Sequence, residues 1–196
     1  MHNQVEHSTC YQFADDTCLL VGDRDPHKAI ERLQSDFNNI LKWCHDAKLV
    51  LNIEKTKLLI IQSNSLKEAT GVALVAHDHA CLHKSTVCKC PSIQIVDKQK
   101  YLGLIIDKNM HWKQHIEYVC DKLRQFLAQI TILKNRIPFK TKLSLYNALC
   151  ESVINYGLSS YGRTYPTYLN QIYNLQMRIL KHVVSRNVLD SYKSEE

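Results

Sequence analysis

The chain has 196 residues, of which 45% are hydrophobic and 22% are charged, as in ordinary globular proteins. No apolar run approaches the roughly 18 residues that cross a bilayer, and residues Met1 to Glu6 lack the basic and apolar regions of a signal peptide. Composition therefore excludes a membrane-spanning or secreted protein and predicts an intracellular one, nuclear or cytoplasmic. The eight cysteines lie mostly within apolar segments, which predicts reduced thiols.

Charge is distributed unevenly along the chain. Residues 1–110 contain 13 lysines and arginines and 13 acidic residues, whereas residues 111–190 contain 11 basic and 4 acidic residues, a surplus of 7. A segment this basic fits a polyanionic partner such as nucleic acid, although basic helical domains without such a partner are also common.

Two adjacent carboxylates, Asp15 and Asp16, interrupt an apolar, β-prone run from Cys10 to Val21. Buried carboxylates are costly, so the pair is expected at the tip of a hairpin, where both acids reach water or a cation. Hard oxygen ligands suit Mg²⁺ or Mn²⁺. The alternative is an ordinary surface turn, in which aspartate is common.

The hairpin is followed by a predicted helix and a small sheet. Asp25 and Pro26 suit a helix start, and apolar residues at three- and four-residue steps extend the helix to about residue 47. Residues 49–52 and 57–61 are expected to be extended and to form a small antiparallel sheet under this helix. Short strands are expected over residues 72–109, and the last of them contains Lys100 to Asp107.

From His111 onward the apolar pattern is purely helical. One helix is predicted to reach Leu133 and to be broken by Pro138, a second to reach about Tyr156, and a third to contain Leu169 to Val183. The sequence thus predicts an α+β fold, with domains at 1–110 and 111–190 and a tail at 191–196.

Four motifs in this order resemble a known family. They are Phe13-Ala14-Asp15-Asp16-Thr17, Leu51-Asn52-Ile53-Glu54-Lys55-Thr56-Lys57, Lys100-Tyr101-Leu102-Gly103-Leu104-Ile105-Ile106-Asp107 and His111-Trp112-x-x-His115-Ile116. Over roughly residues 8–185 the chain resembles the C-terminal part of reverse transcriptases from jockey-like retrotransposons that lack long terminal repeats. The order and spacing of the four motifs make chance agreement improbable.

The resemblance implies a partial palm in residues 1–110 and roles for six of its residues. Asp15 matches the carboxylate that binds both catalytic Mg²⁺ ions, Asp16 its supporting neighbour, and Lys55 a lysine proposed to neutralise the leaving pyrophosphate. Two-metal phosphoryl transfer is the implied chemistry. Tyr101, Leu102 and Gly103 match the turn that holds the primer end. The alternatives are a solvated lysine at a strand end and an ordinary hairpin.

Residues 111–190 then correspond to an all-helical thumb, which binds the duplex of RNA template and DNA primer mainly through phosphates. Each basic side chain alone could equally be a solubilising surface residue. The candidates for phosphate contact are Lys113, Lys122, Arg124, Lys134, Arg136, Lys140 and Lys142.

A two-metal site needs carboxylates from more than one strand. The family's other metal-binding aspartate precedes the hairpin, only fourteen residues precede Asp15 here, and neither Asp23 nor Asp107 matches the missing position. The sequence therefore predicts a truncated or fragmentary chain that is inactive alone. The alternative is a non-catalytic nucleic-acid-binding module or relic protein.

A cysteine and histidine cluster between the Lys55 and Tyr101 motifs is a second candidate metal site. His79, Cys81, Cys88 and Cys90 are all good zinc ligands, but their spacing is unlike that of common zinc sites. The alternative, which this spacing favours, is a metal-free hairpin.

Overall fold

The computed structural model describes residues 4–63, 71–78, 81, 89–133 and 135–184. The chain divides into two compact units, residues 1–99 and 100–196. Both contain helices, and the strands among the described residues form two-stranded sheets. A mixed α and β architecture is therefore confirmed, and no helix among the described residues is long and apolar enough to cross a membrane.

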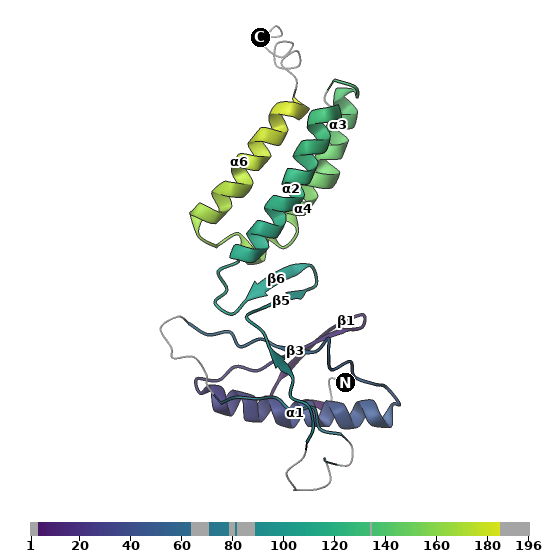
Figure 1. The fold of residues 1–196 in the computed structure, drawn as a ribbon, viewed down its shortest axis with the longest axis vertical. Helices are drawn as coiled ribbons and strands as arrows, with labels where there is room; N and C mark the ends of the chain where they lie inside the picture. The colour runs from purple at the N-terminus through teal and green to yellow at the C-terminus, as the bar shows by residue number, and fades with distance from the viewer. Residues whose placement is uncertain (1–3, 64–70, 79–80, 82–88, 134, 185–196) are drawn as a thin grey trace. The chain divides into compact units, whose positions relative to one another are not determined.

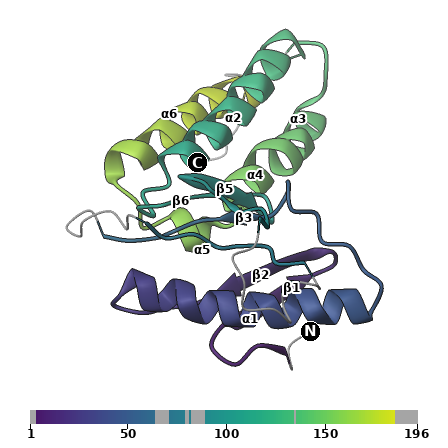
Figure 2. The ribbon, with the colours of Figure 1, turned by 60° about the horizontal axis from the view of Figure 1, so that its bottom comes forward.

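The first unit begins with an antiparallel hairpin of β1 (Thr9–Phe13) and β2 (Asp16–Leu20). It lies along helix α1 (Pro26–Asp46), as Figure 2 shows. The half-buried Leu19 of β2 packs against the core of this unit, which includes Phe37 of α1. The hairpin and helix match the sequence-based prediction, because apolar flanks and a Pro-containing helix start are strong local signals.

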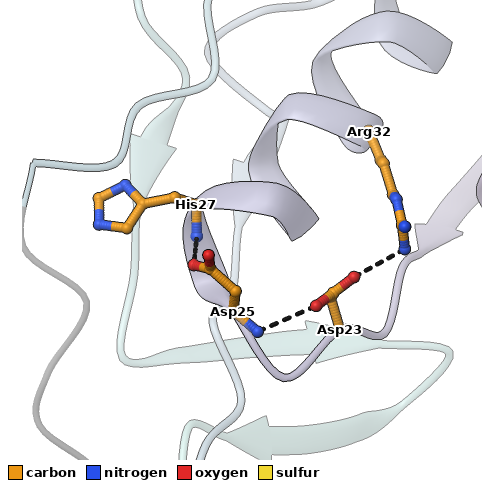
Figure 3. Close-up of polar contacts among 4 residues, drawn as sticks. All are labelled: Asp23, Asp25, His27 and Arg32. Atoms are coloured by element: carbon orange, nitrogen blue, oxygen red, sulfur yellow. Dashed lines mark hydrogen bonds and ion pairs between the residues drawn. The ribbon is translucent and has the colours of Figure 1, made fainter.

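Helix α1 has the predicted cap (Figure 3). Asp25 Oδ1 accepts a hydrogen bond from the backbone N–H of His27 at 2.9 Å, and Pro26 occupies the first turn. Asp23 accepts from the Asp25 N–H at 3.0 Å and pairs with Arg32 at 2.7 Å. These contacts give hydrogen-bond acceptors to backbone N–H groups at the exposed start of α1. They also fix the path of the chain from the hairpin to the helix.

The remaining sheet of this unit is smaller than predicted and differs in direction. Strand β3 (Lys57–Leu58) pairs with β4 (Gln94–Ile95), and the pairing is parallel. The prediction of an antiparallel sheet is therefore wrong here; a long connection separates the two strands, which permits either direction. Residues 49–52 form no strand, and Val50 is 96% exposed.

Polar contacts attach the connecting segments to α1. The side-chain amide of Gln34 donates to the carbonyl of Val75 at 2.8 Å and accepts from its N–H at 2.7 Å. Leu74 and Ala76, on either side, are buried together with Ile93. The hydrogen bonds of Gln34 and the burial of Leu74 and Ala76 thus hold residues 71–78 against α1.

The second unit contains a hairpin and a helical bundle. The hairpin consists of β5 (Lys98–Tyr101) and β6 (Leu104–Asp107), and the first two residues of β5 belong to the first unit. The predicted break at Pro138 and three main helical regions are present. In Figure 1, α2 and α6 run side by side. The helices are α2 (Lys113–Leu133), α3 (Phe139–Tyr146), the π-helical turn η3 (Asn147–Glu151), α4 (Ser152–Asn155), α5 (Leu158–Tyr161) and α6 (Pro166–Val183).

Candidate functional site

The acidic pair lies at the tip of the β1–β2 hairpin. Phe13 pairs with Asp16 across the ladder, so Ala14 and Asp15 form a two-residue turn. Ala14 has φ 52°, as such a tight turn requires. Asp15 and Asp16 are both exposed, and within the described residues neither carboxylate makes an ion pair. The hairpin thus presents two adjacent carboxylates to solvent.

Two carboxylates suit one hard divalent cation but do not complete a two-metal centre. In the part of the chain that the structure describes, no third His, Cys, Asp or Glu ligand atom lies within 4.8 Å of both carboxylates. Asp23 is engaged at the start of α1 (Figure 3), where the Asp25 amide, aided by Arg32, lowers its pKa. The described residues therefore supply one carboxylate pair.

Asp107 also has a structural role. Its carboxylate is buried and accepts hydrogen bonds from the backbone N–H groups of Asn109, His111 and Trp112, at 3.1, 3.0 and 2.7 Å. Met110 and Trp112 have φ values of 55° and 63°, so the connection between β6 and α2 is tightly turned. Asp107 braces this connection and belongs to the second unit.

A buried carboxylate holds the segment that leads into β1. Asp36 of α1 is fully buried and accepts from the backbone N–H groups of Glu6, His7 and Ser8, at 2.9, 3.0 and 2.6 Å. Burial opposes its ionisation, but hydrogen bonding by Ser8, Glu6 and His7 outweighs burial and lowers its pKa. Asp36 thereby fixes the start of the strand that carries the acidic tip.

Lys55 lies in a turn that Asn52 organises. The side-chain oxygen of Asn52 accepts from the Lys55 N–H at 3.1 Å, and its carbonyl accepts from the Thr56 hydroxyl at 2.8 Å. Lys55 is exposed at this turn, just before β3. The Asn, Lys and Thr of the motif therefore have one local explanation: they close a turn and present the lysine to solvent.

The predicted primer-holding residues form the turn between β5 and β6. Leu102 and Gly103 have φ values of 44° and 82°, which fit a type I′ hairpin turn. The Tyr156 hydroxyl donates to the Leu102 carbonyl, and a Cβ on Gly103 would lie 2.9 Å from Cε1 of Tyr156. Glycine is therefore required by both backbone conformation and the close tyrosine ring.

A hollow of about 360 Å³ lies beside this turn. Gly103 lines it together with residues of α2 and of the region that ends in Tyr156. Lys122, a predicted phosphate contact, also lines it. The structure thus brings one primer-holding residue and one basic candidate to the same surface.

Tyr118 of α2 lines the same hollow and was not identified from the sequence. The ammonium groups of Lys100 and Lys122 lie 5.0 and 5.8 Å from its ring centroid. Lys100 and Tyr118 come from separate elements, so no local spacing could have indicated the cluster. Aromatic and basic groups in this combination can stack on a base and pair with a phosphate.

The remaining basic candidates differ in exposure. Lys113, Arg124, Arg136 and Lys140 are exposed, and Arg124 pairs with Asp121 one turn earlier on α2. Lys142 is only 4% exposed, so little of it can reach a phosphate. Lys134 lies outside the described residues.

His115 also lines the hollow and is 1% exposed. Its Nδ1 accepts from the Ile105 N–H at 3.4 Å, and its Nε2 has no hydrogen-bond partner among the described residues. Its ring makes an edge contact with the buried Tyr161 at 4.9 Å between centroids. Burial lowers the pKa of His115, so the side chain is held neutral.

Of the predicted zinc ligands, His79 and Cys88 lie outside the described residues. Cys81 and Cys90 are described, and with Asp78 they form a group whose ligand atoms all lie within 4.8 Å of one another. Asp78 was not among the predicted ligands, because a carboxylate does not stand out in a cysteine and histidine pattern.

Comparison with known proteins finds relatives among mobile-element polymerases. The chain is 24% identical over 178 residues to the RNA-directed DNA polymerase from mobile element jockey of Drosophila melanogaster, covering 87% of this chain and 17% of the relative. It is 22% identical over 178 residues to the jockey polymerase of Drosophila funebris, with the same coverage. A probable RNA-directed DNA polymerase from transposon BS of Drosophila melanogaster is 23% identical over 174 residues, covering 87% of this chain and 18% of that protein.

No family model matches the chain, and no solved structure matches it. The chain spans about 17% of the length of the jockey relatives. The relatives align with 87% of it, which is most of both units. The chain is therefore a homologue of the RNA-directed DNA polymerases of jockey and other retrotransposons that lack long terminal repeats.

Proposed function

We propose that this chain supplies the acidic hairpin of the palm, and the thumb, of an RNA-directed DNA polymerase from a mobile element. The observation that carries the proposal is the exposed Asp15 and Asp16 at a two-residue hairpin tip in a chain whose relatives are such polymerases. An ordinary surface turn would explain the exposure but not the homology.

In the proposed mechanism, Asp15 would hold the catalytic cations and Asp16 would support it. Bound Mg²⁺ or Mn²⁺ would activate the primer hydroxyl and stabilise the leaving pyrophosphate. The ligand set fits, since both groups are carboxylates that reach solvent and form no ion pair within the described residues. Lys55, exposed at its turn, would neutralise the pyrophosphate.

The turn of Tyr101, Leu102 and Gly103 would position the primer end. Its backbone is fixed by positive φ values and by the Tyr156 hydroxyl, so it can present carbonyl and N–H groups in one geometry. The basic helices would bind the duplex of RNA template and DNA primer through phosphates. Lys122 and Tyr118, beside Gly103, are the residues best placed to act with the turn.

The 196 residues alone are expected to be inactive. Their described part offers one carboxylate pair, and a two-metal centre needs ligands from a further strand. The same hairpin exposes apolar surface, with Phe13 at 66% and Tyr11 and Leu20 each at 53%. Those side chains offer a face on which another segment of a polymerase can pack.

Primer extension tests this proposal. The 196-residue chain alone is expected to give no Mg²⁺-dependent product. The same chain joined to the preceding polymerase segment of a jockey relative should extend a primer, and Asp15→Ala should abolish extension. Asp46→Ala, an exposed carboxylate at the end of α1, is the matched control and should leave activity intact. Extension by the isolated chain, or by the joined Asp15→Ala variant, would refute the proposal.

A second function, duplex binding without catalysis, is favoured by the exposure of Lys113, Lys122, Arg136 and Lys140 in the second unit. Binding should weaken steeply with salt, and charge reversal at these four positions should flatten the slope by about one per lost phosphate contact. Reversal of the exposed Lys28 and Lys42 of α1 is the control. An unchanged salt dependence of binding in the four-residue variant would contradict this function.

A further inference from the structure

A cluster of sulfur and oxygen ligands lies in the first unit, in the connection between β3 and β4. The Sγ atoms of Cys81 and Cys90 are 3.4 Å apart. The carboxylate of Asp78 lies within 4.8 Å of both. Among the described residues this is the one group of three or more potential metal ligands, and the proposed polymerase chemistry does not use it.

The fold brings the three residues together through a short antiparallel contact. Val75 and Ser92 form a bridge, and flanking it Ala76 N–H donates to the Pro91 carbonyl at 2.9 Å and Ile93 N–H to the Leu74 carbonyl at 2.7 Å. Leu74, Ala76 and Ile93 are buried in the core of the unit. The segments that carry Asp78 and Cys90 are therefore anchored side by side by buried residues.

The turn at Asp78 positions the other thiol. The N–H of Cys81 donates to the Asp78 side chain at 2.7 Å and to its backbone carbonyl at 3.1 Å. Cys81 and Cys90 are half-buried, whereas Asp78 is exposed. An ion at this position would thus be shielded on the sulfur side and open to solvent on the carboxylate side.

We propose that Asp78, Cys81 and Cys90 bind one Zn²⁺ ion. Two thiolates bonded to a tetrahedral zinc at about 2.3 Å lie about 3.8 Å apart, so the observed 3.4 Å separation needs only a small adjustment. Without an ion the thiols would be protonated and the Sγ–Sγ contact would be an S–H···S hydrogen bond donated by Cys90. A bound divalent cation would instead balance the charges of two thiolates and a carboxylate. Water or one further ligand completes the tetrahedron.

The proposed ion would link the segment that carries Asp78 and Cys81 to the segment that carries Cys90. It would thereby stabilise the connection between the Lys55 turn and the Tyr101 strand. Cysteine thiols must lose their protons to bind zinc, so binding should release protons and strengthen as pH rises. This role is structural and goes beyond the proposed polymerase function, because neither Asp15 nor Asp16 takes part in it.

Zinc titration of the reduced, metal-free 196-residue chain tests the proposal. One Zn²⁺ per chain is expected in competition with a chromophoric chelator, and Co²⁺ in its place should give a thiolate-to-cobalt charge-transfer band. Cys81→Ser with Cys90→Ser should abolish both signals, and Asp78→Asn should weaken zinc binding at least tenfold. Cys18→Ser, at another half-buried thiol, is the control and should bind as the unchanged chain does.

Circular dichroism of each variant separates loss of ligands from loss of fold. Should the double cysteine variant unfold, the cobalt band of the unchanged chain and at least tenfold weaker metal binding by Asp78→Asn at retained helicity decide the question. Absence of stoichiometric zinc, zinc binding that survives the double substitution, or a Cys81–Cys90 disulfide in chain purified under reducing conditions would each overturn the proposal.

Discussion

In the second unit, sixteen buried hydrophobic residues among those described form one cluster, whereas the cluster of the first unit contains five. The bundle is stabilised mainly by apolar packing along α2 and α6. The first unit relies more on polar contacts, such as those of Asp36, Gln34 and Asp25. Its candidate catalytic residues, Asp15, Asp16 and Lys55, lie at exposed turns. The candidate catalytic residues and the larger apolar core of this chain therefore lie in different units.

The largest expected effect is in the bundle core. Leu123 of α2 is completely buried, and Leu123→Ala should lower the free energy of unfolding by about 4 kcal/mol because it leaves a cavity. Chemical denaturation followed by helical circular dichroism measures this. A loss below about 1 kcal/mol would contradict the tight packing of the bundle, and Ala128→Ser on the exposed face of α2 is the control.

The next largest effect concerns the polar contacts of the first unit. Asp36→Ala removes the charged acceptor of three backbone N–H groups and should cost about 3 kcal/mol, because three part-buried hydrogen bonds to a carboxylate are lost together. Amide hydrogen exchange should speed up at residues 6–8 and along β1. Asp46→Ala, at an exposed carboxylate of the same helix, should change neither quantity. Unaltered exchange at residues 6–8 in Asp36→Ala would show that the brace is unimportant.

Gly103→Ala should have a smaller and more local effect, about 2 kcal/mol. The positive φ disfavours an L side chain, and the new Cβ would clash with the Tyr156 ring. Gly22→Ala meets no atom within 4 Å and serves as the control. Equal stability of the two variants would mean that the turn tolerates side chains.

The smallest effect is the pH dependence caused by His115. Burial lowers its folded-state pKa, so the unfolded chain binds the proton first as pH falls through about 6.5. Stability should therefore decrease with falling pH between the ordinary and the lowered pKa. His115→Asn should reduce the slope of unfolding free energy against pH in that window, and an identical slope would assign the dependence to other groups.

The sequence predicted the elements whose signals are local. The β-prone flanks of Asp15 and Asp16, the Asp25-Pro26 helix start and the Pro138 break all act within a few residues. The parallel pairing of Lys57–Leu58 with Gln94–Ile95 depends on residues far apart in the chain, so periodicity could not predict it.

The same limit applies to the site. Asp36 is an acid on a helix, ordinarily a solvated position, and its burial under residues 6–8 has no local signal. Lys142 matched a phosphate-binding pattern by charge alone, and packing buries it. The contact of Tyr118 with Lys100 is recognised only when β5 and α2 are seen together.

The central claim, that the β1–β2 tip binds a divalent cation, is tested most directly by Mn²⁺-induced broadening of backbone amide signals in the 196-residue chain. Broadening should centre on residues 14–17 and disappear in Asp15→Asn with Asp16→Asn, while Asp46→Asn should leave it unchanged. Broadening that is absent at residues 14–17, or that persists there in the double variant, would contradict the claim.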